Sequence, residues 1–276
     1  MNLLRKGNSS AGAIAAAFSR CSREKRSAFI PFLVAGDPSL DATPDLLRAL
    51  VAGGADVIEL GIAFSDPIAD GPTIQRASHR ALVAGSSLSA VLGIVERHRG
   101  ELGVPIVLFT YYNPVHARGV EAFAAQAADS GVDGVLCVDL PPDEGLRELQ
   151  PALSDRGVDS IYLIAATSTR ERIDRAAAAS NGFVYYTARS DVKGERDDLL
   201  PTLAREVKRV RRRVRLPVAV GFGISTPEQV REVARVAHGV VVGSSLVRLV
   251  EENASEPDLA ARLERRVNEL TSPLGS

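Results

Sequence analysis

The sequence has no tryptophan, one methionine and only two cysteines among its 276 residues. Cys21 and Cys137 lie far apart and Cys137 falls in an apolar run, so we expect free thiols and a reducing, cytoplasmic location. A formal net charge of −1 gives no support for a nucleic-acid or membrane surface. No apolar run approaches the ~20 residues that span a bilayer. Residues 11–18 precede a polar stretch and predict a short helix rather than a secretory signal.

Short apolar runs recur eight times with helical spacing between them. The runs cover residues 28–34, 57–60, 105–110, 134–138, 160–164, 183–187, 218–221 and 240–243. Each run is nearly continuous rather than alternating, which is typical of parallel strands covered on both faces. We therefore predict an α/β fold, a (β/α)8 TIM barrel with an extra N-terminal helix, as one domain over residues 1–276 with a frayed tail from about 272. An open doubly wound sheet is the alternative, but no Gly-x-Gly-x-x-Gly follows the first strand.

Two carboxylates stand out beside the second apolar run. Glu59 ends that run and Asp70 lies in the following turn with Gly71 and Pro72. A buried carboxylate is costly unless it is used, and two that converge on one substrate can act as acid and base. In a barrel, chemistry lies at the carboxyl ends of the strands. Other polar residues at those positions are Tyr111, Asn113, Asp139 and Tyr185.

Glycine-rich stretches follow the last three strands. Residues 221–225 read Gly-Phe-Gly-Ile-Ser, Gly243 and Ser244 open a helix, and Gly194 lies after the sixth strand. Glycines let backbone N–H groups approach an anion, and a helix N-terminus adds a favourable dipole. Any one of these glycines alone is equally well explained as a turn in the chain, but together they favour a phosphate site at Gly194, Gly223, Gly243 and Ser244.

Other polar groups receive the simpler interpretation. The basic run 208–213 is expected to close a helix, where cations suit the dipole, rather than to bind nucleic acid. The histidines do not have the spacing of metal ligands, so no metal site is predicted. These histidines are His79, His98, His116 and His238.

The motifs together resemble the tryptophan synthase alpha chain family. The most specific is Glu59-Leu60-Gly61, continued by Phe64-Ser65-Asp66-Pro67 and by residues 69–75, Ala-Asp-Gly-Pro-Thr-Ile-Gln. Further similar stretches are Pro31-Phe32 with residues 35–38, Tyr111-Tyr112-Asn113-Pro114, Val138-Asp139-Leu140-Pro141, Gly221-Phe222-Gly223-Ile224 and Gly243-Ser244. The resemblance covers nearly the whole chain.

The resemblance implies a retro-aldol cleavage of indole-3-glycerol phosphate to indole and D-glyceraldehyde 3-phosphate. Glu59 would give a proton to the indole ring and take one from the side-chain hydroxyl, and Asp70 would accept the indole N–H. The indole pocket would include Phe29, Leu108, Tyr111, Asp139 and Tyr185, with Leu136 as a further wall residue. For each apolar residue taken alone, plain core packing is the favoured interpretation, since apolar strand residues are core by default. No cofactor is implied on this chain; pyridoxal phosphate belongs to a beta chain that takes the indole in an alpha2-beta2 assembly.

Three positions depart from the family pattern. The loop after the sixth strand, which the resemblance implies is a lid with Arg189, carries Asp191 where the family has Gly and Lys193 where it has Thr. Ala63 replaces a Pro in the loop that meets the beta chain. We expect Lys193 to pair with Asp70 or to reach the substrate phosphate.

These departures leave four functions open. They are an alpha subunit that works with a beta chain, a stand-alone lyase that releases free indole, a non-catalytic partner that activates a beta chain, and another phosphosugar barrel such as an isomerase. The retained pair Glu59 and Asp70 argues against a scaffold.

Overall fold

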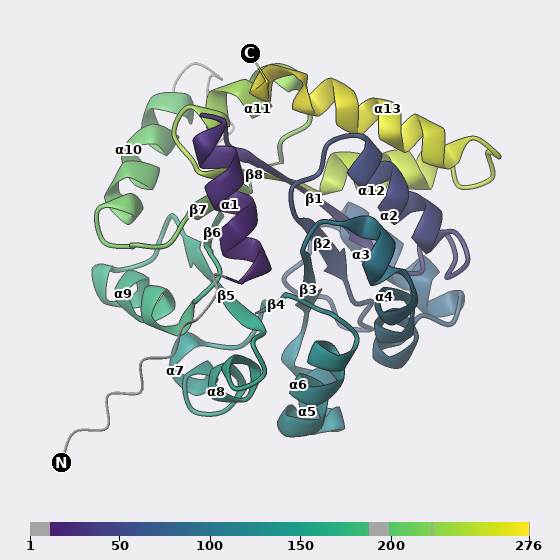
Figure 1. Ribbon diagram of the computed structural model, residues 1–276, viewed down its shortest axis with the longest axis horizontal. Helices are drawn as coiled ribbons and strands as arrows, with labels where there is room; N and C mark the ends of the chain where they lie inside the picture. Colours follow the sequence, from purple (N-terminus) through teal and green to yellow (C-terminus); the bar gives the residue numbers. More distant parts are fainter. Residues whose placement is uncertain (1–11, 188–198, 222, 276) are drawn as a thin grey trace.

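The structure is a computed structural model that describes residues 12–187, 199–221 and 223–275. In this part of the chain, eight parallel strands close into a barrel in sequence order (Figure 1). The strands are β1 (Ala28–Val34), β2 (Ile58–Gly61), β3 (Ile106–Thr110), β4 (Gly134–Cys137), β5 (Asp159–Ala165), β6 (Val184–Thr187), β7 (Val218–Gly221) and β8 (Gly239–Val242). The TIM-barrel prediction is confirmed, and each expected strand lies within about a residue of an observed one.

Helices surround the barrel (Figure 1). They are α1 (Ala13–Arg23), α2 (Thr43–Ala52), α3 (Pro72–Val83), α4 (Leu88–Leu102), α5 (Tyr112–Arg118), α6 (Val120–Asp129), α7 (Pro142–Gly145), α8 (Leu149–Ser154), α9 (Arg170–Ala179), α10 (Leu199–Arg211), α11 (Pro227–Ala234), α12 (Ser244–Glu252) and α13 (Leu259–Thr271). Thr226 and Gln229 form a capping box at the start of α11. The basic run lies at the end of α10, as the dipole argument expects. No single helix among the described residues has the length and apolar composition of a membrane span; α3 and α4 meet them only as a pair bent by 88°.

Residues that alternate along the strands belong to two separate buried clusters. The inner cluster fills the barrel and contains Ala28, Ile30, Val57, Val107, Leu136, Ile161, Phe183, Ala219 and Val241. The outer cluster lies between the strands and the helices and contains the intervening strand residues. Because successive side chains of a strand point to opposite faces, a residue two positions beyond an inner one also faces inward. Glu59, two residues after Val57, therefore faces the barrel interior.

Helix α1 covers the amino end of the barrel. Its residues Ile14, Phe18 and Cys21 are buried in the inner cluster. The Phe18 ring lies 5.5 Å from the ring of Phe183, which precedes β6. Figure 1 shows this helix lying across the strands rather than in the ring of helices. The extra N-terminal helix of the prediction is therefore a plug that completes the barrel core.

The chain end differs from the expected frayed tail. Ser272–Leu274 forms a 3-10 helix, and Pro273 and Leu274 are buried. The helix packs against α11 and α13. The prediction of fraying from about 272 is wrong for these residues, because burial of two apolar side chains outweighs the polar character of the tail.

A buried carboxylate fastens α1 to the barrel. Asp56, 2% exposed, accepts hydrogen bonds from Arg26 at 2.6 and 2.8 Å, from Arg20 at 2.7 Å and from the Phe29 amide at 3.0 Å. Burial alone raises the pKa of Asp56, but the bonds from Arg26, the Phe29 amide and Arg20 outweigh it and hold the pKa below its usual value. This stabilisation is present above the usual aspartate pKa and is lost as the pH falls through the lowered one.

Replacing this carboxylate tests the fastening. We expect Asp56→Asn to lower the free energy of unfolding at pH 7 by about 2–4 kcal/mol, because it removes one partner of a buried ion pair whose arginines keep some solvent. Urea unfolding measures the change. Asp45→Asn, which removes the exposed partner of Arg48, is the matched control and should cost under about 0.5 kcal/mol. Equal losses in both variants would contradict the assigned role of Asp56.

Candidate active site

A cavity of about 580 Å³ lies at the carboxyl ends of the strands. Its lining comprises Phe32, Glu59, Ala69, Asp70, Gly71, Ile74, Phe109, Val138, Leu163, Ala165, Arg172, Tyr185, Thr187, Gly221, Gly223, Val241, Gly243 and Ser244. The set contains both predicted carboxylates, three of the predicted phosphate-binding residues and the predicted Tyr185. Every strand that contributes does so through its inward-facing side chains, so strand alternation selects the lining.

Glu59 is a carboxyl group held in an apolar setting. Its side chain is 1% exposed, and the Oε1 atom has no hydrogen-bond partner within the described residues. Burial raises the pKa of Glu59 to about 8, and no cation among the described residues opposes the shift. At neutral pH the group therefore holds a proton that it can donate into the cavity. Buried polar groups are nearly always partnered, so this exception points to a functional role.

Two glycines make room for aromatic rings beside Glu59. A Cβ at Gly221 would lie 2.2 Å from the Tyr185 hydroxyl, and one at Gly61 would lie 2.8 Å from the Phe32 ring. Any larger residue would displace these rings from the cavity. Burial and the nearby Glu59 raise the pKa of Tyr185 well above its usual value, so Tyr185 stays a neutral phenol.

Asp70 enters the cavity from the loop between β2 and α3. Tyr111 donates a hydrogen bond to Asp70 Oδ2 at 3.1 Å, and the Tyr111 oxygen accepts one from the Ala69 amide at 3.0 Å. The Tyr111 ring stacks on Phe64 with centroids 4.9 Å apart. Burial raises the pKa of Asp70 to about 6 and the bond from Tyr111 opposes the shift. Asp70 is therefore largely ionised at neutral pH, in contrast to Glu59.

Backbone groups dominate another part of the lining. Helix α12 starts at Ser244 with Gly243 as its N-cap, and the amides of Leu246 and Val247 return to the Gly243 carbonyl. The first amides of the helix have no intrahelical acceptor and suit an anion. Gly223 has a φ of +53°, a left-handed conformation that favours glycine. The Ser245 hydroxyl donates to the Ile224 carbonyl at 3.2 Å and joins the two loops.

The walls of the cavity are apolar, but three of the expected wall residues lie elsewhere. Phe29 and Leu108 are fully buried in the outer cluster, under the helices. Leu136 faces inward but lies in the inner cluster below the cavity. The prediction that these residues form the indole walls is therefore wrong. Phe29 and Leu108 point to the outer face of their strands, and Leu136 points inward but lies below the cavity. The walls are instead Phe32, Phe109, Val138, Leu163, Ile74 and Val241.

Tyr111 and Asp139 do not line the cavity but support it. Tyr111 orients Asp70 as described above. Asp139 accepts a hydrogen bond from the Tyr112 amide at 2.7 Å and so ties the end of β4 to the start of α5. Arg189, Asp191, Lys193 and Gly194 lie outside the described residues, so the expected pairing of Lys193 with Asp70 stays a prediction.

Among the lining residues that sequence reasoning missed are two aromatic walls, Phe32 and Phe109, and a cation, Arg172. Phe32 and Phe109 lie in the inward phase that Glu59 defines, since Phe32 is opposite Glu59 in the β1–β2 register and Phe109 is opposite Gly61. Their rings meet edge to face at 5.3 Å. Arg172 comes from α9 and carried no sequence signal. It is the one cation in the lining, and among the described residues no carboxylate pairs with it.

Comparisons with known proteins point to one family. The profile of the family described as "Tryptophan synthase alpha chain" matches residues 18–273. The chain is 48% identical over 254 residues to the tryptophan synthase alpha chain of Solibacter usitatus, which covers 92% of this chain and 95% of the relative. It is 47% identical over 245 residues to that of Opitutus terrae, which covers 89% of this chain and 92% of the relative.

Solved structures have the same fold. Tryptophan synthase subunit alpha from Legionella pneumophila superposes with a TM-score of 0.89 at 34% identity, over 96% of this chain and 99% of that one. A chain of Mycobacterium tuberculosis tryptophan synthase superposes with a TM-score of 0.87 at 36% identity, over 97% and 100%. The chain therefore belongs to the tryptophan synthase alpha chain family.

Proposed function

We propose that Glu59 and Asp70 carry out the reaction of this family, the cleavage of indole-3-glycerol phosphate to indole and D-glyceraldehyde 3-phosphate. The observation that supports these roles best is that two carboxyl groups in different settings line one cavity, Glu59 buried with an unpartnered Oε1 atom among the described residues and Asp70 held by Tyr111. Glu59 keeps its proton because burial raises its pKa to about 8, and Asp70 loses its proton near pH 6. Acid and base are thus available together at neutral pH.

The proposed reaction uses Glu59 twice. Its carboxyl proton goes to the indole ring carbon that bears the glycerol chain, which leaves a positively charged ring. The Glu59 carboxylate then takes the proton of the adjacent side-chain hydroxyl as the carbon–carbon bond breaks. The bonding pair returns to the ring and restores indole, and the hydroxyl oxygen becomes the aldehyde oxygen. Glu59 ends the cycle protonated, as it began.

Asp70 supports the charged intermediate in this proposal. Its carboxylate accepts the indole N–H and stabilises the positive charge that develops on the ring. The hydrogen bond from Tyr111 keeps Asp70 oriented and partly offsets the effect of burial on its pKa. The apolar walls hold the bicyclic ring, and Gly223, Gly243 and Ser244 hold the phosphate.

The proposal needs no metal or organic cofactor on this chain, because both proton transfers use Glu59. Indole passes to a beta chain with pyridoxal phosphate in an alpha2-beta2 assembly. Exposed apolar side chains on the loop that carries Asp70 and at the end of α3 support docking of a partner: Ile68 is 86% exposed, Val83 77% and Leu82 36%. The free, buried Cys21 and Cys137 fit a cytoplasmic location.

Partner dependence separates the open alternatives. We expect the purified chain to release indole slowly and a beta chain to raise the rate markedly while the two co-elute in gel filtration. Indole release that is unaffected by a beta chain would favour a stand-alone lyase, and no release under either condition would favour a non-catalytic activator. An isomerase would convert a phosphosugar without forming indole.

Substitution of the carboxyl groups tests their roles. We expect Glu59→Gln and Asp70→Asn each to lower kcat by about 10²–10⁴-fold, the usual contribution of a positioned acid or base. Indole release measures the loss. Glu59→Gln should be at least as stable as the parent at pH 7.5, because the raised pKa makes ionisation of Glu59 costly to the folded state as the pH rises toward 8. An active Glu59→Gln enzyme would contradict the proposal.

The pH profile provides a second test. We expect kcat/KM to be bell-shaped, with an acid limb near pH 6 as Asp70 becomes protonated and an alkaline limb near pH 8 as Glu59 loses its proton. The residual activity of Asp70→Asn should lack the acid limb from this group. An acid limb that survives unchanged in that variant would assign it to the substrate phosphate instead.

Arg172 supplies a third test. We propose that this unpaired cation attracts the substrate phosphate, so Arg172→Gln should raise KM about two- to fivefold and leave kcat within twofold. Arg170→Gln, one residue before Glu171 on the same helix and outside the cavity lining, is the matched control. The ratio of parent to Arg172→Gln activity should shrink with added salt. Equal effects of both substitutions would argue against a specific role.

A further inference from the structure

A second and larger cavity, of about 800 Å³, lies at the amino ends of the strands. Residues that come just before β7 and β8, including Pro217 and His238, form one side, and α1 forms the other. Pro273 and Leu274 complete the lining near the chain end. The active-site cavity lies at the opposite ends of the same strands. This amino-end cavity has no part in the proposed cleavage.

The lining of the amino-end cavity carries charge of one sign. It contains no aspartate or glutamate, and its cations are Lys25, Arg26, Arg211, Arg215, Arg231 and Arg235. Arg26 is fully engaged with Asp56 and Glu24. Among the described residues, none of the other five lies within 4.0 Å of a carboxylate. Glu228 on α11 offsets part of the charge of Arg231, and all five cations are exposed. Together they still give the rim of the cavity a positive potential that favours an anion.

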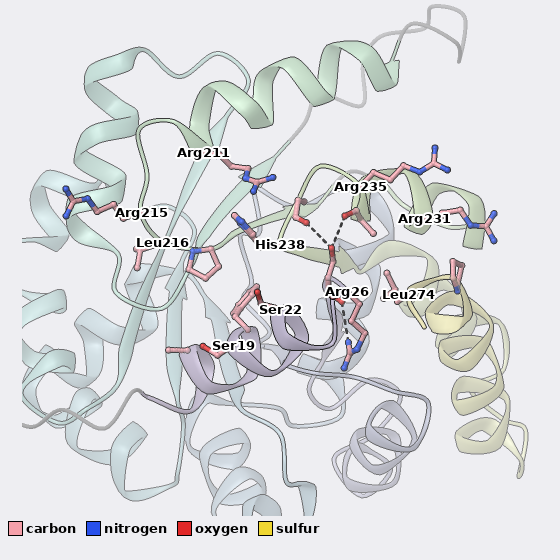
Figure 2. A pocket seen from close by; sticks show the side chains of 18 residues that line it. Ser19, Ser22, Arg26, Arg211, Arg215, Leu216, Arg231, Arg235, His238 and Leu274 are labelled. Carbon is pink, nitrogen blue, oxygen red and sulfur yellow. Dashed lines mark hydrogen bonds between the residues drawn. The ribbon is translucent and has the colours of Figure 1, made fainter. Parts of the chain in front are cut away.

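Figure 2 shows how these groups are arranged. Arg211 lies beside His238 near the centre of the view, with Arg231 and Arg235 on one side and Arg215 on the other. Arg211 also donates to the Val236 carbonyl at 3.0 Å, which fixes its guanidinium in place. The side chains of Arg215, Arg231 and Arg235 extend away from the centre of the view, so these cations stand at the rim of the cavity, on α11 and on the turns that follow α10 and α11.

His238 adds a neutral donor. Its Nδ1 accepts a hydrogen bond from the Val218 amide at 2.9 Å, so the ring proton of the neutral form is on Nε2. Burial, and then the nearby Arg211, lower the pKa of His238, which keeps the ring neutral at pH 7. The hydroxyls of Ser19 and Ser22 on α1 supply further donors. The cavity thus offers donors from both of its sides.

Lys25 is held there against its backbone preference. It follows α1 with a φ of +56°, the one positive φ of a non-glycine residue in the described part of the chain. The Lys25 amide returns to Ser22 and the Arg26 amide to Cys21, the hydrogen bonds of a helix end at which glycine is the favoured residue. A lysine is strained at this position. Strain of this kind persists where a side chain serves a purpose.

From the charge, the donors and the strained Lys25 we infer that the amino-end cavity binds a small anion with two or more phosphate groups. A concave site of this size suits a small molecule, and the net charge of −1 gives the chain no general affinity for nucleic acid. Because the cavity is at the opposite end of the barrel from the exposed Ile68, it stays open when a partner docks beside Asp70.

Titration of the full chain with inorganic tripolyphosphate tests the inference. In low salt at pH 7.5 without divalent cations, calorimetry should show one binding site. The double variant Arg231→Gln/Arg235→Gln should weaken binding at least tenfold. The control Arg97→Gln/Arg156→Gln removes the same charge from exposed positions outside the cavity and should change affinity less than twofold.

Three outcomes would overturn the inference. They are equal weakening in the two double variants, displacement of tripolyphosphate by an equal concentration of glycerol 3-phosphate, and tighter binding of a 12-nucleotide DNA than of tripolyphosphate. The first marks nonspecific charge attraction, the second places the anion in the active-site cavity, and the third identifies a nucleic-acid surface.

Lys25→Gly separates binding from folding. Relief of the left-handed strain should raise the Tm of the unliganded chain by about 1–3 °C, while loss of the cation weakens tripolyphosphate binding at least threefold. A residue with a purely structural role would not change stability and affinity in opposite directions. Affinity equal to that of the parent in Lys25→Gly and in Arg231→Gln/Arg235→Gln would overturn the inference.

Discussion

The unpartnered burial of the Glu59 carboxyl group is the constraint on which the active end of this barrel depends. A carboxyl group surrounded by apolar walls stays protonated only while water is kept away from it. Strand alternation points Glu59 inward, Gly221 and Gly61 leave room for Tyr185 and Phe32, and neither ring offers it a charge partner. The glycines at the strand ends therefore help to keep Glu59 protonated, because they leave room for the rings that surround it.

The contacts that hold α1 lie at the other end of the barrel. Helix α1 fills the amino mouth, and Asp56 joins two arginines to the first two strands. This division follows the polarity of a parallel barrel, in which every strand presents the same end to the same face. The burial of the Glu59 and Asp70 carboxyl groups at the carboxyl end is unfavourable, whereas the Asp56 ion pairs that hold α1 lie at the amino end. The cationic hollow beside α1 is the exception, since it gathers positive charge at the amino end.

Much of this organisation could be predicted from the sequence. Apolar runs between helical stretches gave the barrel, and carboxylates or glycines at the ends of those runs gave Glu59, Asp70, Gly223 and Gly243 as cavity residues. Phe29 and Leu108 were wrongly expected as cavity walls, because a continuously apolar strand does not reveal which of its side chains point inward. In this barrel the inward position of Glu59 shows which alternate residues face the cavity. Arg172 and the support of Asp70 by Tyr111 depend on contacts between distant segments, which no local pattern contains.

The Tyr111 hydroxyl connects a surface loop with Asp70, whose pKa depends on the hydrogen bond it accepts from this hydroxyl. The Tyr111 oxygen accepts a hydrogen bond from the Ala69 amide, and the Tyr111 hydroxyl donates one to Asp70. Ile68, the neighbour of Ala69, is the most exposed large apolar side chain of the described residues. A displacement of Ile68 would move the neighbouring Ala69 amide and so the Tyr111 hydroxyl that is bonded to it. A docked protein that shifted this loop would therefore change the hydrogen bond that Asp70 accepts from Tyr111, and with it the pKa of Asp70.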